Sequence, residues 1–449
     1  MPKIDACLTR AAKAAPALCL GIVLSFALGR EAAALYDVKP GDAVGKPGSI
    51  IRVWPLEGGG PGGANAFRIL YRSTSPAGEP IAVSGAIFIP PGSPPPGGRN
   101  VIAWAHPTSG VVEDCAPSLM PDLAGMIWGL AGMMAQGYVV VATDYPGLGV
   151  PGMIHPYLIG PSEGRAVLDS VRAARDLPDA AASNRFAVWG HSQGGQASLY
   201  AGELAASYAP DLKLVGVAAA APATYLVELF DADKTSSEGK ELTAMTVLSW
   251  SRLENLPVTT IVEPDAVPAF EKTARACIES LAQFEAINKD EHPLQTIQFL
   301  KADPSETEPW KGIMLQNTPG QAPAGAPVFI AQGTADTTVR PEITKQFGDH
   351  LCSQHARRFR RTAGRDAYLR RQGRCARRAG LDGRALQGRA GAVKLRTLEH
   401  ELAGRDGQDQ NDDEDDEEEE EQDLGELARA AGEAGIAKGA GDQRDQQTD

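Results

Sequence analysis

A serine inside a Gly-x-Ser-x-Gly pattern is the clearest chemical signal in the chain. Ser192 stands within Gly190–Gly194, after the apolar run Phe186–Trp189 and before the helical stretch Gln193–Ser207. A strand, a tight turn and a helix in this order hold a serine on a strained turn with its hydroxyl exposed. Glycines flank the serine because the strand and the helix approach closely there. The pattern predicts that Ser192 is a nucleophile; the alternative is a purely structural turn.

An aspartate follows a later apolar run. Pro327–Ala331 leads into Gln332–Asp336, which places Asp336 just past the end of a predicted strand. A carboxylate at that position can hold a catalytic histidine in the tautomer that accepts the proton of a serine. Because Ser192 precedes Asp336 along the chain, we favour this role over that of an aspartate that caps a loop.

The loop after the apolar run Val101–Ala105 predicts an oxyanion-binding site. Backbone N–H groups near Ser109 and Gly110 follow the end of this run, where a donor to a tetrahedral oxyanion is expected. The second donor would be the backbone N–H of Gln193, directly after the predicted nucleophile. His106 precedes the serine and lies in this loop, so we interpret it as structural and not as the base.

The elements that must position these residues are short apolar runs separated by helical stretches. Near-continuous apolar runs suit strands that are buried on both faces of a parallel sheet, and alternation with helices predicts an α/β fold. The predicted strands are Val101–Ala105, Tyr138–Ala142, Phe186–Trp189, Leu214–Ala218 and Pro327–Ala331, and the main predicted helices are Glu163–Leu177 and Gln193–Ser207.

Residues 225–321 interrupt this rhythm with long polar and helical segments. An insertion of this size between two strands predicts a helical cap, or lid; a second, unrelated domain is the alternative. The expected organisation is a signal peptide, a first part of an α/β-hydrolase-like core, the cap, a second part of the core with Asp336, and a tail. The respective ranges are 1–34, 35–224, 225–321, 322–354 and 355–449.

Composition excludes several classes of function. The net charge is −14, and Asp412–Glu421, ten consecutive acidic residues, supplies most of it. The rest of the chain is nearly neutral, so neither nucleic acid nor an anionic membrane surface is an expected partner. Cysteines and histidines show no metal-ligand spacing and no dinucleotide fingerprint is present, so we expect no metal and no organic cofactor.

The N-terminus predicts export. Basic residues precede the apolar stretch Ala14–Leu28, and Ala32–Ala34 offers a cleavage site. A membrane anchor is the alternative, but the stretch is short for a bilayer span. We therefore expect a secreted or periplasmic protein, in which the remaining cysteines can form disulfides in any of three pairings. These cysteines are Cys115, Cys277, Cys352 and Cys375.

Four segments match one family in combination: Cys115–Ser118, Asp144–Gly149, Gly190–Gly195 and Gln332–Asp336. With them, the chain from Leu35 to Cys352 resembles the secretory lipase family, a branch of the α/β-hydrolases with a helical lid. The resemblance implies hydrolysis of acyl esters, lipids included, through an acyl-enzyme on Ser192. It also implies a disulfide between Cys115 and Cys277. The expected partner is a small-molecule or lipid ester, with transient contact at a lipid interface and no obligate protein partner.

The histidine of the triad is missing from its expected place. The family pattern puts it about thirty residues past Asp336, where the chain has none. Of the later histidines, His350 lies in the predicted helix after Asp336. His355 comes early and His400 lies in a polar segment; these two are the remaining candidates for the base.

An abrupt change to an Arg-, Ala- and Gly-rich composition at Gln354 suggests a shifted reading frame near codon 354. Read one base later, suitable codons can encode an apolar strand, a Pro-Gly turn, a histidine that spans Ala367 and Tyr368, and a final helix. If the tail is genuine, it is expected to be disordered. The chain would then be a non-catalytic binding protein with the same fold. A serine hydrolase that acts on amides or polyesters is a further alternative.

Overall fold

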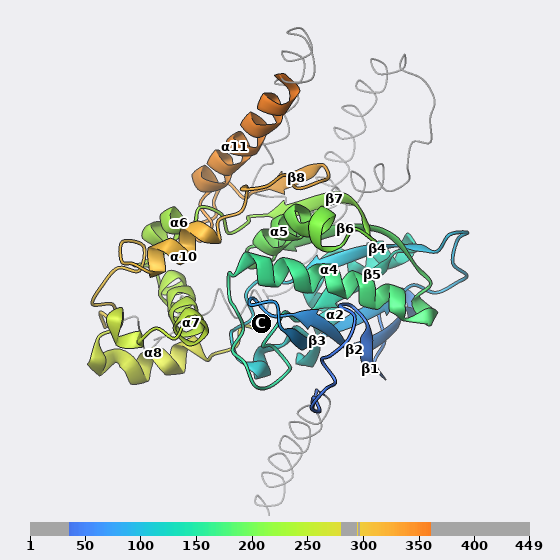
Figure 1. Cartoon of the computed structure of the whole chain (residues 1–449), viewed down its shortest axis with the longest axis horizontal. Coiled ribbons are helices and arrows are strands. Elements are labelled where there is room, and N and C mark those ends of the chain that lie inside the picture. The colour runs from blue at the N-terminus through green and yellow to red at the C-terminus, as the bar shows by residue number, and fades with distance from the viewer. Residues whose placement is uncertain (1–35, 280–293, 295–296, 361–449) are drawn as a thin grey trace, which may run out of the picture. The chain divides into compact units, whose positions relative to one another are not determined.

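The computed structural model describes residues 36–279, 294 and 297–360, so the predicted signal peptide, Cys375, His400 and the acidic run lie outside the described residues. The described chain forms one eight-stranded mixed sheet in the order β1-β2-β3-β5-β4-β6-β7-β8 (Figure 1). The strands are β1 Ile50–Pro55, β2 Asn65–Thr74, β3 Pro80–Ile89, β4 Arg99–Ala105, β5 Val139–Thr143, β6 Ala182–His191, β7 Lys213–Ala220 and β8 Val328–Ala331.

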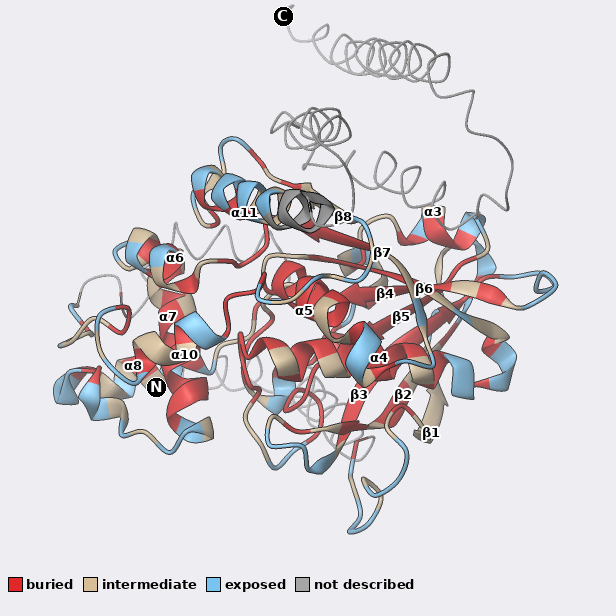
Figure 2. Ribbon diagram, turned by 45° about the horizontal axis from the view of Figure 1, so that its top comes forward, coloured by how far each residue is buried: buried red, intermediate tan, exposed pale blue. Residues whose placement is uncertain are grey.

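The five predicted strands correspond to β4–β8, and all their mutual pairings are parallel. Successive side chains point to opposite faces of the sheet, so Val101 and Ala103 of β4 join one buried cluster while Ile102 and Trp104 join another. Because both faces are covered, these strands need apolar residues at every position, and Figure 2 shows β4 and β6 as largely buried.

The N-terminal strands are longer and more regular than the sequence indicated. β1, β2 and β3 form an antiparallel meander, and β3 pairs antiparallel with β5. The strand-like run Ile81–Ile89 lies in β3, whereas no pattern in the sequence indicated β2. Arg68 and Arg72 interrupt the apolar pattern of β2; their guanidinium groups donate to the carbonyl oxygens of Ser118 and Val44.

Helices cover both faces of the sheet. Apolar residues of α4 and α5 pack in the cluster that holds Val101 and Ala103, and residues of α2 and α3 pack in the cluster that holds Ile102 and Trp104. This two-sided cover confirms the α/β class predicted from the sequence. The helices are α2 Leu123–Met126, α3 Leu130–Ala135, α4 Gly160–Asp176 and α5 Gln193–Tyr208.

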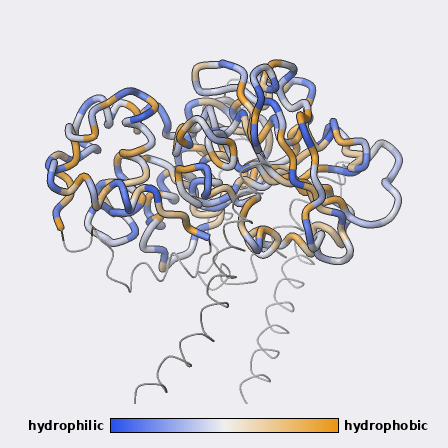
Figure 3. The backbone as a smooth tube through the Cα atoms, turned by 90° about the horizontal axis from the view of Figure 1, so that it is seen from below, coloured by the Kyte–Doolittle hydropathy of each residue, from blue (hydrophilic) through white to orange (hydrophobic). Residues whose placement is uncertain are grey.

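A group of helices lies to one side of the core, inserted between β7 and β8 (left in Figure 1). Their shared core contains aromatic residues: the rings of Phe230 and Trp250 lie 6.4 Å apart, and those of Trp250 and Trp310 lie 6.5 Å apart. Orange and blue alternate along their traces in Figure 3, as expected of amphipathic helices. We call this group the cap; its helices are α6 Leu226–Asp233, α7 Ser237–Leu253, α8 Val267–Ala274 and α10 Trp310–Gln316.

The last described helix continues further than the sequence indicated. The Arg-rich segment after Gln354 was expected to lack helical pattern, but α11 spans Pro341–Arg360. Alanine and arginine favour helix, so the first residues after Gln354 can extend it. His350 lies in this helix as expected, and the backbone of His355 also belongs to it.

Candidate active site

Ser192 lies on a strained turn at the junction of β6 and α5. Its backbone angles are φ 57° and ψ −119°, a left-handed φ that costs about 1–3 kcal/mol in a residue other than glycine. Backbone hydrogen bonds hold the turn: the Ser192 N–H donates to the Ala220 carbonyl over 2.9 Å, and the Ser192 carbonyl accepts from the Ala223 N–H over 3.1 Å. The Ser192 side chain remains half-buried, so its hydroxyl can reach a ligand.

The flanking glycines are required by close backbone approach. A Cβ on Gly190 would meet the carbonyl oxygens of Gly194 and Ala105, and a Cβ on Gly194 would also clash with the Ala105 carbonyl oxygen. The end of β4, which carries Ala105, therefore touches the turn directly. This contact brings the loop after β4 next to Ser192.

We expect Gly194→Ala to lower the free energy of unfolding by about 3 kcal/mol, because the added methyl group must push two backbones apart. Gly348→Ala is the matched control, since a Cβ on Gly348 in α11 meets nothing within 4 Å. The control should be unchanged or stabilised by up to about 1 kcal/mol. Chemical denaturation of both variants measures the difference, and equal stabilities would show that the close approach is absent.

Three buried backbone N–H groups, one at the start of α5 and two in the loop after β4, are candidate donors to a ligand. Within the described residues, the N–H groups of Gln193, Ser109 and Gly110 donate no hydrogen bond. Unpaired N–H groups are rare in protein interiors, and Gln193 and Ser109 are each only 1% exposed. A set of such donors can bind an oxygen atom that becomes negatively charged during a reaction.

A disulfide and a backbone hydrogen bond tie the cap to this loop. Cys115 is bonded to Cys277, as the family resemblance implied. Gly110 packs against Cys115, so that a Cβ on Gly110 would clash with the disulfide sulfur. The Ile278 N–H donates to the Ser109 carbonyl over 2.9 Å. These contacts fix the loop that carries two of the unpaired N–H groups.

Asp336 is held rigidly in the loop after β8. Its Oδ1 accepts from the N–H groups of Thr338 and Val339 over 3.0 and 2.9 Å, and its Oδ2 accepts from Gln332 Nε2 over 3.1 Å. Gln332 in turn accepts a hydrogen bond from the Thr344 hydroxyl over 2.6 Å. In the described part of the chain, the donors to Asp336 are two backbone N–H groups of its own loop and the side-chain amide of Gln332. None of them is a histidine.

The acid loop is also joined to the cap. Arg340 Nη2 donates to the Ala232 carbonyl over 3.1 Å, and Arg340 Nε lies 3.5 Å from Asp233 Oδ1. Burial raises the pKa of Asp233 to about 7, against the effect of Arg340. The loop that carries Asp336, through Arg340, and the loop at Ser109 therefore both contact cap helices or their flanking segments.

Two described histidines are fully buried and have structural partners. Burial lowers the pKa of His106 to about 4 and that of His155 to about 3, so both are neutral at neutral pH. His106 Nδ1 donates to the Pro107 carbonyl over 2.7 Å, which agrees with its interpretation as structural. The Nδ1 of His155 donates to the Pro146 carbonyl over 2.9 Å.

The candidate bases from the sequence are not brought to Ser192 by any described contact. His350 is exposed on α11, and its Nε2 lies 3.3 Å from the Gly320 carbonyl oxygen. The side chain of His355 and all of His400 lie outside the described residues. The identity of the base therefore stays a prediction.

Sequence reasoning missed two residues beneath the predicted oxyanion site. His155 and Glu163 are both fully buried and contact the side chain of Gln193. Neither belongs to a recognised motif, and Glu163 stood out only as the first residue of a predicted helix. The sequence alone does not indicate that Glu163 is buried and in contact with Gln193; only the tertiary structure shows it.

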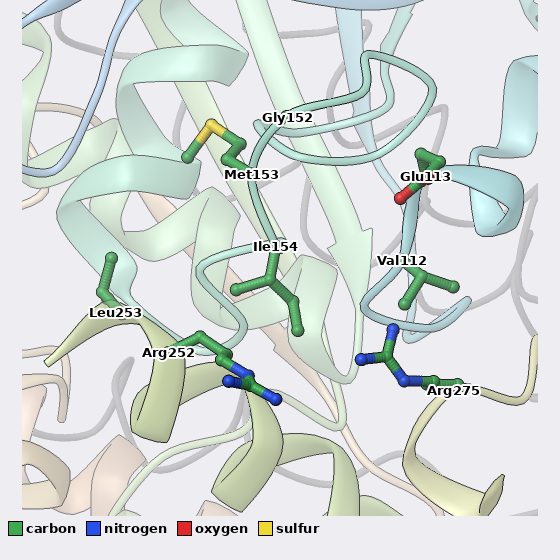
Figure 4. Close-up of a pocket in the computed structure, with 8 residues that line it drawn as sticks. All are labelled: Val112, Glu113, Gly152, Met153, Ile154, Arg252, Leu253 and Arg275. Atoms are coloured by element: carbon green, nitrogen blue, oxygen red, sulfur yellow. The ribbon is translucent and has the colours of Figure 1, made fainter. Parts of the chain in front are cut away.

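One cavity of about 500 Å³ lies between core loops and the cap (Figure 4). Neither Ser192 nor Asp336 is among the residues that line it. Within the described ranges, no three His, Cys, Asp or Glu side chains cluster as metal ligands would. Among the same residues, no helix has the length and apolar character of a membrane span. The lining residues are Val112, Glu113, Gly152, Met153, Ile154, Arg252, Leu253 and Arg275.

The sheet order, the strained serine turn after β6 and the aspartate after β8 define an α/β-hydrolase fold. The crystal structure of lipase A from Candida antarctica shares this fold: the TM-score is 0.59 at 19% identity, over 71% of this chain and 77% of that one. Residues 126–361, more than half of the chain, match the family described as secretory lipase, and the chain belongs to that family.

Curated relatives match over shorter stretches. Lipase A from Moesziomyces aphidis is 29% identical over 184 residues, which are 38% of this chain and 38% of that protein. A Mycobacterium tuberculosis protein named "Probable inactive lipase" is 28% identical over 192 residues, 39% of this chain and 42% of that protein. The chain thus matches less than half the length of these relatives.

Proposed function

We propose that the protein hydrolyses carboxylic esters of small molecules or lipids through an acyl-enzyme on Ser192. The observation that carries this proposal is the strained Ser192 turn, together with the buried N–H groups of Gln193, Ser109 and Gly110, which donate no hydrogen bond within the described residues. A nucleophile and oxyanion donors that act on one carbonyl group are what acyl transfer requires. Membership of the secretory lipase family supports the same reaction class.

In the proposed reaction, Ser192 Oγ bonds to the ester carbonyl carbon while a histidine accepts the serine proton. The oxyanion is stabilised by the N–H of Gln193 and by those of Ser109 and Gly110. Collapse of the intermediate breaks the ester C–O bond, and the histidine gives its proton to the leaving alcohol. Water then attacks the carbonyl of the acyl-enzyme while the histidine accepts a proton from the water. Collapse of this second intermediate releases the acid and returns the proton to Ser192. Asp336 holds the histidine in the required tautomer.

We further propose that this histidine is encoded in the shifted frame after codon 354. The family match ends at residue 361, close to the change of composition. Val328, Phe329 and Ile330 of β8 are only half-buried, although they are apolar strand residues at the end of the sheet. A further strand and helix, which the shifted frame can encode, would cover them. We call the protein translated after correction of one base near codon 354 the frame-restored chain.

A second function is favoured if the present frame is genuine. Asp336 then has only loop partners in the described structure, and no side-chain hydrogen bond joins Ser192 to a histidine among the described residues. The chain would be a non-catalytic binding protein with an α/β-hydrolase fold. The Mycobacterium tuberculosis relative named "Probable inactive lipase" is consistent with loss of activity within this group.

We also propose that the protein is exported through an N-terminal signal peptide. The family is described as secretory, and the Cys115–Cys277 disulfide is typical of proteins from oxidising compartments. Ester substrates that form aggregates would be met at a lipid interface outside the cell. No protein partner is required for the proposed chemistry.

Hydrolysis of matched esters and amides tests the proposed substrate class. The frame-restored chain is expected to cleave p-nitrophenyl acyl esters of increasing chain length faster than the p-nitroanilides of the same acids. The reason is that p-nitrophenolate can leave as an anion, whereas the nitrogen of a p-nitroanilide must be protonated as the C–N bond breaks. Faster cleavage of the anilides would assign an amidase instead.

A further inference from the structure

The side chain of Gln193 points into a buried polar cluster beneath the proposed oxyanion site. Gln193 Nε2 lies 2.7 Å from His155 Nε2 and donates to Glu163 Oε1 over 2.8 Å. Glu163 Oε1 also accepts from the Leu158 N–H over 3.0 Å. His155 and Glu163 are fully buried and Gln193 is 1% exposed, so no bulk water competes for these hydrogen bonds.

The hydrogen-bond roles of His155 and of the Gln193 amide N–H groups follow from their partners. A carbonyl oxygen only accepts, so the contact with the Pro146 carbonyl places the proton of His155 on Nδ1. His155 Nε2 is then an acceptor and takes one amide hydrogen of Gln193, while Glu163 takes the other. Burial raises the pKa of Glu163 to about 8, so this side chain is a neutral acid at neutral pH.

We propose that Glu163 and His155 are positioning residues that hold the Ser192–Gln193 peptide so that its N–H faces the oxyanion; this rests on the proposed function. Gln193 is the first residue of α5 and directly follows the strained Ser192. Strained backbone persists only where its surroundings fix it. Two hydrogen bonds from one amide group, to partners on α4 and on the loop before it, fix Gln193 in this way.

The loop that contains His155 also contacts the loop that carries Ser109. The Tyr157 hydroxyl lies 2.8 Å from the Thr108 hydroxyl, next to Ser109. On the cap side, the Ser249 hydroxyl of α7 donates to the His155 carbonyl over 2.6 Å, and Trp250 Nε1 donates to the Tyr157 carbonyl over 2.8 Å. Helix α7 therefore holds the loop that contacts the Gln193 side chain and Thr108.

The test compares Glu163→Ala with the conservative Glu163→Gln in the full chain. Glutamine keeps a neutral acceptor at the same position, whereas alanine removes it. We expect Glu163→Ala to lower the kcat of Ser192-dependent ester hydrolysis about 10–100-fold with little change in KM, because the loss falls on the transition state. Glu163→Gln should stay within about threefold of the unmodified chain, within the usual effect of a conservative change.

A second readout does not depend on chemistry. In protein labelled with ¹⁵N-glutamine, the backbone amide of Gln193 should give one sharp signal in the unmodified chain and in Glu163→Gln. Glu163→Ala should broaden or split this signal through exchange between peptide orientations. If hydrolysis is too slow to measure, this signal alone decides the positioning role.

Asp169→Ala is the matched control. Asp169 is a fully buried carboxylate of the same helix, but its partners are Ser73, Tyr208 and Arg172, away from Ser192. It should lower the melting temperature without changing kcat or the Gln193 signal. An unchanged Gln193 signal and kcat in Glu163→Ala would overturn the positioning role. Hydrolysis that persists without Ser192 would instead overturn the proposed function.

Discussion

Ser192→Ala is expected to lower kcat/KM of the frame-restored chain for short acyl esters by about 10⁴–10⁶, as removal of a triad serine does in other hydrolases. The physical reason is that alanine leaves the oxyanion donors and the binding surface intact but removes the atom that forms the acyl-enzyme. Only water could then attack the ester. Steady-state hydrolysis of a chromogenic ester by the purified variant measures the effect.

Ser198→Ala provides the control for this experiment. Ser198 is a buried serine of the same helix, and its hydroxyl donates to the Gly194 carbonyl over 2.8 Å. Its loss removes a hydrogen bond worth about 1 kcal/mol without touching the reacting atoms. We expect near-normal hydrolysis by this variant. More than a tenth of normal activity in Ser192→Ala would contradict the nucleophilic role.

Correction of the reading frame near codon 354 is expected to raise kcat/KM for the same esters by about 10⁴ over the chain as written. The correction supplies the base that accepts the Ser192 proton. It also supplies a strand to cover the apolar side chains of β8, which are half-buried in the described structure. Resequencing of codons 340–400 from fresh template DNA is the first step, followed by kinetics of both proteins.

Two outcomes separate folding from catalysis in this comparison. Replacement of the restored histidine by alanine should return kcat/KM to that of the chain as written, while the melting temperature stays that of the frame-restored chain. If fresh template confirms the present frame, the proposed histidine does not exist. Catalysis would then need His355 or His400, and the non-catalytic function would gain support.

The residues around Ser192 could be predicted because their signal is local. The strained turn and its glycines occupy five consecutive positions, and the clash at Gly194 explains why this spacing is required. The strands β4–β8 were also predictable, because burial on both faces demands unbroken apolar runs. The Cys115–Cys277 pair came from family resemblance alone, since four cysteines by themselves leave the pairing open.

The cluster at Gln193 could not be predicted, because its members are brought together only by tertiary structure. Glu163 lies 30 residues from Gln193 and His155 lies 38 residues from it, with no fixed spacing to mark them. Strand β2 was missed because Arg68 and Arg72 interrupt its apolar pattern. In the structure their guanidinium groups donate to the carbonyl oxygens of Ser118 and Val44, outside the strand. A helix around His350 was predicted without bounds, and the continuation of α11 to Arg360 depends on helix propensity within an unusual composition.

The site of covalent labelling is the most direct test of the central claim, that Ser192 forms the acyl-enzyme. The frame-restored chain, shown to be folded by circular dichroism, is treated with a fluorophosphonate and the adduct is located by tandem mass spectrometry of its peptides. We expect one adduct, on Ser192 in the peptide that contains Gly190–Gly195, and none in Ser192→Ala. An adduct on a different serine, or no adduct on the folded chain, would show that Ser192 is not the nucleophile.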